Sequence, residues 1–166
     1  LMAGYQIVTE TMNGVLDYKG VPYQILAKDP AFSDSTVHIE IPDGSVGLIY
    51  INGKLTAYAT RKEYTFWNVF DKYEIKIISM TETEIGEDVT KQMLSLIPAN
   101  LHTDVQISEG ETGLLYYDNV LKRQLSKGSY HFWNYNHNVT CRNIDMRQKQ
   151  LDITGQEILT RDKIGI

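Results

Sequence analysis

The chain has 166 residues, a mass of 19.0 kDa and a formal net charge of −5, and 42% of its residues are hydrophobic. This length fits one ordinary domain or two small ones, and the composition excludes a disordered polyelectrolyte and a general nucleic-acid binder. The single cysteine, Cys141, excludes an internal disulfide framework and a multi-cysteine zinc site. No stretch approaches the roughly 18 apolar residues of a membrane span, so we expect none in this chain.

Residues 1–35 are expected to hold the tail of a preceding repeat and a short helix. When the sequence is aligned with itself, Tyr5–Ile7 falls on Tyr73–Ile75, and in the same alignment Val21–Asp29 falls on a later helical run that ends before Pro98. Repeats are sought before elements are assigned, because a missed repeat gives the wrong architecture. We interpret this match as a partial upstream repeat.

Residues 36–85 are predicted to form a small β module of about five strands. Apolar side chains alternate with polar or small ones from Ile39 to Tyr50 and again from Tyr73, which is the period of two expected of half-buried strands. Asn52–Gly53 lies between two apolar runs and indicates a two-residue hairpin turn. These residues are therefore assigned to β repeat 1.

Residues 86–101 are predicted to form a linker helix. Val89, Met93, Leu96 and Ile97 recur at helical spacing, and Pro98 ends the run because proline cannot donate a backbone hydrogen bond. One short helix is thus expected to join two β modules.

Residues 102–153 are predicted to be a second copy of the first module. When Ile39 is aligned with Val105, 12 of the 47 positions from Ile39 to Ile85 are identical without a gap, and the segment YTFWN at 64–68 falls on YHFWN at 130–134. The predicted fold is therefore mainly β (α+β), with two tandem small antiparallel β modules of about five strands each.

The aromatic strand of each copy supplies the candidate interaction surface. Side chains alternate across a strand, so the tyrosines and tryptophans of this segment face opposite sides, and both sides carry an aromatic ring. Burial of a large aromatic ring is worth several kcal/mol, so each tryptophan should meet a helix, the other module or another subunit. The tryptophans could be buried either by core packing within the chain or by assembly with a partner, and the sequence leaves both alternatives open. The residues of this surface are Trp67, Trp133, Tyr64 and Tyr130.

No residue pattern predicts catalysis, a cofactor or a metal. His102, His131 and His137 match no standard metal-ligand spacing, and the chain lacks a phosphate-cradling glycine loop and a nucleophile elbow. We therefore expect a protein that is not an enzyme, with no catalytic, cofactor-binding or metal-binding residues.

The second copy continues into a run of polar and charged residues that carries a family resemblance. The features are Glu109–Gly110 and Gly113 in the first hairpin, Gly128 before the aromatic strand, Asp145–Arg147, and the run Gln156–Asp162. Together they resemble the start of the stomatin/prohibitin/flotillin domain, also called the band 7 or SPFH domain, and are closest to the bacterial slipins. On this resemblance, 102–153 begins a band 7 domain and 154–166 is its truncated continuation.

The resemblance implies a non-enzymatic scaffold or protein-interaction module from the N-terminal region of a slipin-like, membrane-associated oligomer. It further implies self-association of the full-length protein, a membrane protein or membrane protease as partner, no nucleic acid, and a bacterial location in the cytoplasm or at the membrane surface. One alternative is a β module that binds a small molecule or peptide. Another is an accessory regulator of a membrane protease.

Overall fold

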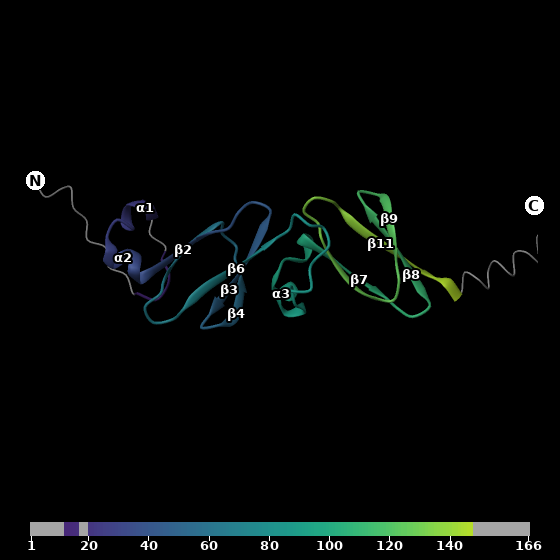
Figure 1. The fold of residues 1–166 in the computed structure, drawn as a ribbon, viewed down its shortest axis with the longest axis horizontal. Coiled ribbons are helices and arrows are strands. Elements are labelled where there is room, and N and C mark those ends of the chain that lie inside the picture. Colours follow the sequence, from purple (N-terminus) through teal and green to yellow (C-terminus); the bar gives the residue numbers. More distant parts are fainter. Residues whose placement is uncertain (1–11, 17–19, 148–166) are drawn as a thin grey trace, which may run out of the picture. The chain divides into compact units, whose positions relative to one another are not determined.

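The computed structural model describes residues 12–16 and 20–147, and strands dominate them (Figure 1). The strands pair into several small antiparallel sheets, which confirms the prediction of a mainly β chain. The chain divides between Ser79 and Met80 into two compact units, called here the first and the second unit. None of the helices in the described ranges has the length and apolar character needed to cross a membrane.

The first unit contains two short helices and two antiparallel sheets. One sheet has the strand order β1-β5-β2 and the other the order β4-β3-β6. The elements are β1 (Gly14–Val15), α1 (Tyr23–Leu26), α2 (Pro30–Ser35), β2 (Thr36–Glu40), β3 (Ser45–Ile51), β4 (Lys54–Tyr58), β5 (Glu63–Trp67) and β6 (Tyr73–Ser79).

Turn chemistry and aromatic packing explain the first unit. Asn52 and Gly53 have φ angles of 52° and 80°, the left-handed pair that a tight hairpin between β3 and β4 requires. The Phe66 ring is 1% exposed and stacks on both Tyr64 and Tyr73, with centroids 5.3 and 4.8 Å away. These rings form the centre of the core of the first unit.

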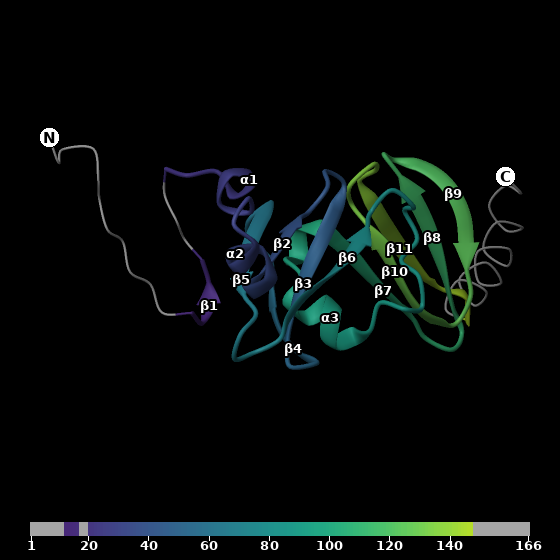
Figure 2. The same ribbon diagram turned by 60° about the vertical axis from the view of Figure 1, so that its left-hand side comes forward.

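The second unit has the same kinds of elements. Its sheets have the orders β10-β7 and β11-β8-β9, and Figure 2 shows β8, β9 and β11 side by side. The elements are α3 (Lys91–Leu96), a 3₁₀ helix η1 (Ala99–Leu101), β7 (His102–Ile107), β8 (Glu111–Tyr117), β9 (Val120–Leu125), β10 (Gly128–Trp133) and β11 (Val139–Asp145).

The core of the second unit is made of inward side chains from all five strands. Full burial of each of these side chains stabilises the fold by about 1.5–3 kcal/mol. Cys141 packs against them, and burial raises the pKa of its thiol, so it behaves as a small apolar side chain. The buried residues are Val105, Ile107, Leu115, Leu125, Phe132 and Val139.

The strand pairing of the first unit recurs in the second. Every residue pair between β3 and β6 has its counterpart between β8 and β11, and the irregularity at Ile49/Tyr50 has its counterpart at Leu115/Tyr116. The pairs between β2 and β5 return in the same way between β7 and β10. Side chains at matching positions of the two units, such as Phe66 and Phe132, therefore have equivalent places in their sheets.

Helix α3 is shorter than the linker helix predicted for residues 86–101, and it belongs to the second unit. It begins only at Lys91 because the Thr90 hydroxyl caps it, accepting a 3.2 Å hydrogen bond from the Met93 amide. In the segment predicted to hold one short helix, α1 is followed by α2, which is capped by the Asp29 carboxylate at 3.0 Å from the Ala31 amide.

Parts of the predicted organisation lie outside the described residues. They include most of the tail assigned to a preceding repeat, with Tyr5–Ile7, and the whole of 154–166. Of the residues that carry the resemblance to band 7 proteins, Gln156–Asp162 also lie there, whereas Glu109–Gly110, Gly113, Gly128 and Asp145–Arg147 are described.

Strand β9 lies at one edge of its sheet and is largely exposed. Val120 and Leu121 are 58% and 53% exposed, and Lys122 and Arg123 follow them on the surface. Only Leu125 at the end of the strand is buried.

Candidate functional site

The four aromatic residues predicted as an interaction surface lie on opposite faces of their strands. Tyr64 is 6% exposed and stacks in the core of the first unit, whereas Trp67 is half-buried with its ring edge-on to Phe32 of α2. Trp133 is 2% exposed, and the half-buried Tyr130 donates a 2.9 Å hydrogen bond to the Ser126 carbonyl. Within neither unit do the tyrosine and the tryptophan share one surface.

A cavity lies within the second unit, between α3, η1 and the strands β7 and β10. Its volume is about 680 Å³, which falls in the range of small-molecule sites. Its apolar wall comes mainly from the helical segment and its polar wall mainly from the strands. The apolar lining residues are Leu94, Leu96, Ile97, Pro98, Ala99 and Val105, and the polar ones are Lys91, Ser95, His102, Asp104, Gln106, Ser129 and His131.

The polar wall is a direct product of strand register. In the pairing of β7 with β10, Asp104 lies opposite His131, and His102 lies two positions before Asp104 on the same strand. Alternate residues of a strand share a face, so His102 and Asp104 face the same way and His131 faces them from the neighbouring strand. The sheet thus gathers two imidazoles around one carboxylate.

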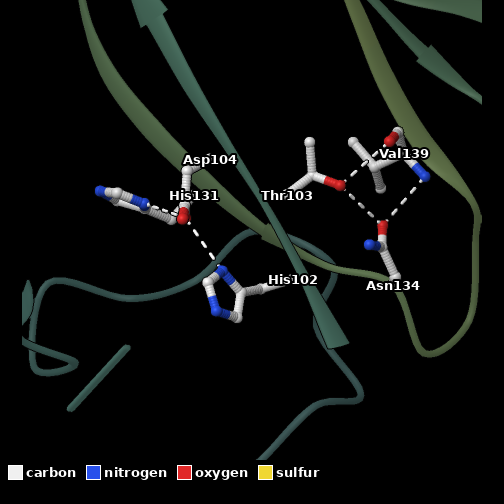
Figure 3. A network of polar contacts seen from close by, with 6 residues as sticks. All are labelled: His102, Thr103, Asp104, His131, Asn134 and Val139. Atoms are coloured by element: carbon white, nitrogen blue, oxygen red, sulfur yellow. Dashed lines mark hydrogen bonds and ion pairs between the residues drawn. The ribbon is translucent and has the colours of Figure 1, made fainter. Parts of the chain in front are cut away.

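Asp104 bridges the two histidines through a single oxygen, as Figure 3 shows. Its Oδ1 lies 3.1 Å from Nδ1 of His102 and 2.6 Å from Nδ1 of His131. The His102 side chain is only 7% exposed, and its Nε2 is buried without a hydrogen-bond partner. A buried ring nitrogen without a partner is costly, which marks His102 as a functional candidate.

Figure 3 also shows a second polar cluster, which holds the chain after β10. The Asn134 side-chain oxygen accepts 3.1 Å hydrogen bonds from the Thr103 hydroxyl and the Val139 amide. These contacts tie the end of β10 to β7 and to the start of β11. None of the three residues lines the cavity, so we assign the cluster the structural role of fixing the strand that carries His131.

The two serines of the cavity wall are not placed for nucleophilic chemistry. Ser129 donates a 2.5 Å hydrogen bond to the Gln106 side chain, and Ser95 donates a 2.6 Å hydrogen bond to the Gln92 carbonyl. A serine nucleophile needs a base within hydrogen-bond reach, and neither hydroxyl is bonded to a histidine.

Three effects act on the ionisation of Asp104. Burial favours the neutral acid, but hydrogen bonds from His131 and His102 and the charges of both rings outweigh it, so the pKa of Asp104 lies below its usual value. A carboxyl group whose pKa is lower in the folded chain stabilises the fold above its unfolded pKa of about 3.9. That stabilisation is lost as the pH falls through the folded pKa.

We therefore expect Asp104→Asn to lower the melting temperature relative to the wild type at pH 5 to 6, and the difference to shrink as the pH falls below about 4. Melting curves followed by circular dichroism from pH 2 to 6 would measure it. The exposed Asp34 of α2, changed to asparagine, is the control. A difference between Asp104→Asn and wild type that is the same at every pH would contradict this role.

The sequence did not reveal this cluster, because it depends on pairing between strands that are far apart along the chain. His102, Asp104 and His131 match no local motif. One signal could have found them: once 102–107 is aligned antiparallel with 128–133, Asp104 stands opposite His131.

Comparison with known proteins does not identify a family for this chain. No family model, no curated protein and no solved structure matches the chain.

Proposed function

We propose that the chain is a non-enzymatic binding module whose second unit holds an apolar group bearing a hydrogen-bond donor. The group is either a small molecule or the side chain of a peptide partner. The observation that carries the proposal is the Nε2 atom of His102, buried without a partner in a side chain that lines a largely apolar cavity.

The protonation of His102 sets the chemistry of the ligand. An ionised carboxylate only accepts hydrogen bonds, so the His102 nitrogen facing Asp104 carries the proton. When the ring is neutral, and not charged as it is where it lowers the pKa of Asp104, the other nitrogen, Nε2, is an acceptor. A ligand that satisfies it must donate an O–H or N–H group.

The apolar wall of the cavity determines which ligand shapes fit. Leu94, Ile97 and Pro98 offer aliphatic surface, and the cavity has room for an aromatic ring. A phenol or an indole combines such a ring with a donor, as the side chains of tyrosine and tryptophan do.

We expect p-cresol to bind the protein more tightly than toluene, which fills the same space without a donor. One net hydrogen bond is worth about 0.5–1.5 kcal/mol, so the preference should reach at most roughly tenfold. Chemical-shift titrations of the ¹⁵N-labelled protein would give both affinities and show whether the shifts fall on residues 91–131.

The matched variants are His102→Leu and His137→Leu. His102→Leu should remove the preference for p-cresol while toluene still binds. His137 bonds to Asp118 in a loop and does not line the cavity, so His137→Leu should keep the preference. Equal affinities for the two compounds in the wild type would contradict the proposal.

A second proposal follows from the resemblance to band 7 proteins. We propose that the full-length protein is a self-associating scaffold at a membrane surface, with a membrane protein or membrane protease as partner. The strand register of the first unit recurs in the second, which supports a tandem duplication. Two tandem β modules are what we expect in the N-terminal region of this slipin-like scaffold. Full-length protein that fractionates as a cytosolic monomer and purifies without a membrane partner would remove this proposal.

A further inference from the structure

The first unit has a polar cluster of its own, on the sheet formed by β2 and β5. It consists of His38, Glu40 and Glu63, whose ligand atoms all lie within 4.8 Å of one another. We propose that these three side chains bind a divalent transition-metal ion, with Zn²⁺ as the reference ion. This inference is independent of the ligand proposed for the second unit.

The strand register places two negative charges directly opposite each other. Glu40 pairs with Glu63 across β2 and β5, and His38 lies two positions before Glu40 on the same strand face. Like charges in directly opposed positions destabilise a sheet, and here solvent weakens the repulsion because the side chains of Glu40 and Glu63 are 69% and 57% exposed. The unit does not require them, because Gln106 and Ser129 occupy the equivalent pair in the second unit.

The imidazole of His38 is held in one orientation. Its ring stacks on Tyr23 of α1, with centroids 4.0 Å apart and planes 8° apart, and its Nδ1 lies 2.8 Å from the Thr65 hydroxyl oxygen. A partner on one ring nitrogen fixes which nitrogen faces a metal, as outer partners of histidine ligands do in metal sites. Thr65 is thus a positioning residue for Nε2 of His38.

The Nε2 atom faces the carboxylates without a hydrogen bond. It lies 3.1 Å from Oε1 of Glu63 and 3.7 Å from Oε1 of Glu40, separations at which a protonated imidazole forms an ion pair with a carboxylate, and it is buried and makes no hydrogen bond to either. The His38 side chain as a whole is 11% exposed. In the tautomer whose Nδ1–H donates to the Thr65 hydroxyl, three electron-pair donors converge on one point, and a cation there satisfies all of them.

The spacing fits a four-coordinate metal. In a tetrahedral zinc site with bonds of about 2.0–2.1 Å, neighbouring ligand atoms are roughly 3.3 Å apart. The two separations from Nε2, 3.1 and 3.7 Å, bracket that value, and the carboxylate oxygens of Glu40 and Glu63 lie within 4.8 Å of each other. One imidazole with two carboxylates suits Zn²⁺ and similar ions, whereas Ca²⁺ takes six to eight oxygen ligands.

Space for a further ligand lies beside the cluster. A cavity of about 220 Å³ is lined by Tyr23, Glu63 and Thr65 among others, so water can reach the cluster from the side of Glu63. Arg61 also lines this cavity, but its guanidinium lies over the Tyr64 ring, 5.8 Å from the centroid.

Titration calorimetry of the whole chain with ZnCl₂ tests the proposal, and Co²⁺ absorption reports the geometry. We expect Glu63→Gln and Glu40→Gln each to weaken the affinity for Zn²⁺ by at least about tenfold, and Thr65→Val to weaken it by about tenfold while the tetrahedral Co²⁺ spectrum persists. Glu74→Gln is the matched control, because Glu74 lies on β6 outside the cluster and forms an ion pair with Lys72, which precedes that strand.

Glutamine keeps the volume of glutamate, so the variants should fold, and circular dichroism would check that they do. Zn²⁺ should also raise the melting temperature of the wild type and of Glu74→Gln but not of Glu63→Gln. Absence of Zn²⁺ binding by the wild type would overturn the proposal. Equal affinities in the wild type and both glutamine variants of the cluster would overturn it too.

Discussion

Replacing Trp133 with alanine is expected to lower the free energy of unfolding of the second unit by about 3–5 kcal/mol, the usual cost of deleting a buried tryptophan ring. The molar mass in solution should not change. The reason is that Trp133 is 2% exposed in the chain, so its removal leaves a cavity in the fold. Denaturant unfolding and light scattering would measure the two quantities.

Trp67→Ala is the comparison within the same chain, because Trp67 occupies the equivalent place in β5. Trp67 is only half-buried, with Phe32 against its ring, so its loss should cost less than that of Trp133. If Trp133→Ala instead changed the molar mass and left the unfolding free energy intact, Trp133 would be an assembly residue.

Replacing Gly113 with alanine is expected to destabilise the second unit by about 1–3 kcal/mol through overpacking. A Cβ atom at this position would lie 2.5 Å from Cδ1 of Ile107 and 3.1 Å from Sγ of Cys141, inside the closed core. The same contact recurs in the first unit, where a Cβ at Gly47 would lie 2.5 Å from Cδ1 of Ile41.

A double-mutant cycle tests this explanation. Ile107→Val removes the Cδ1 atom, so Gly113→Ala should cost less in the Ile107→Val background than in the wild type. Urea unfolding of the four proteins would give the coupling free energy. Additive effects, with no coupling between the two positions, would show that the steric explanation is wrong.

Local features of the sequence were sufficient to predict the mainly β class. Alternation around Ile39 to Tyr50 and the Asn52–Gly53 pair act over short distances along the chain, and the structure has β3, the turn and β4 in those places. Local spacing was less reliable for α3, because the Thr90 cap delays its start to Lys91.

The polar clusters could not be predicted, because they depend on which strands pair. His38 and Glu63 are well separated in the sequence and meet only because β2 pairs with β5 rather than with the strand that follows it. In the same way, His131 meets Asp104 across β10 and β7. A one-residue change in either register would send these side chains to the opposite face.

The edge position of β9 has a consequence for solubility. Among the described strands β9 has no neighbour on its outer side, and such a sheet edge with exposed Val120 and Leu121 is a template on which a strand of another molecule could assemble into a growing fibril. Lys122 and Arg123 follow these residues on the same strand. Arg123 is ion-paired with Glu84 at 2.9 Å, so the charge that would oppose an identical incoming strand is mainly that of Lys122.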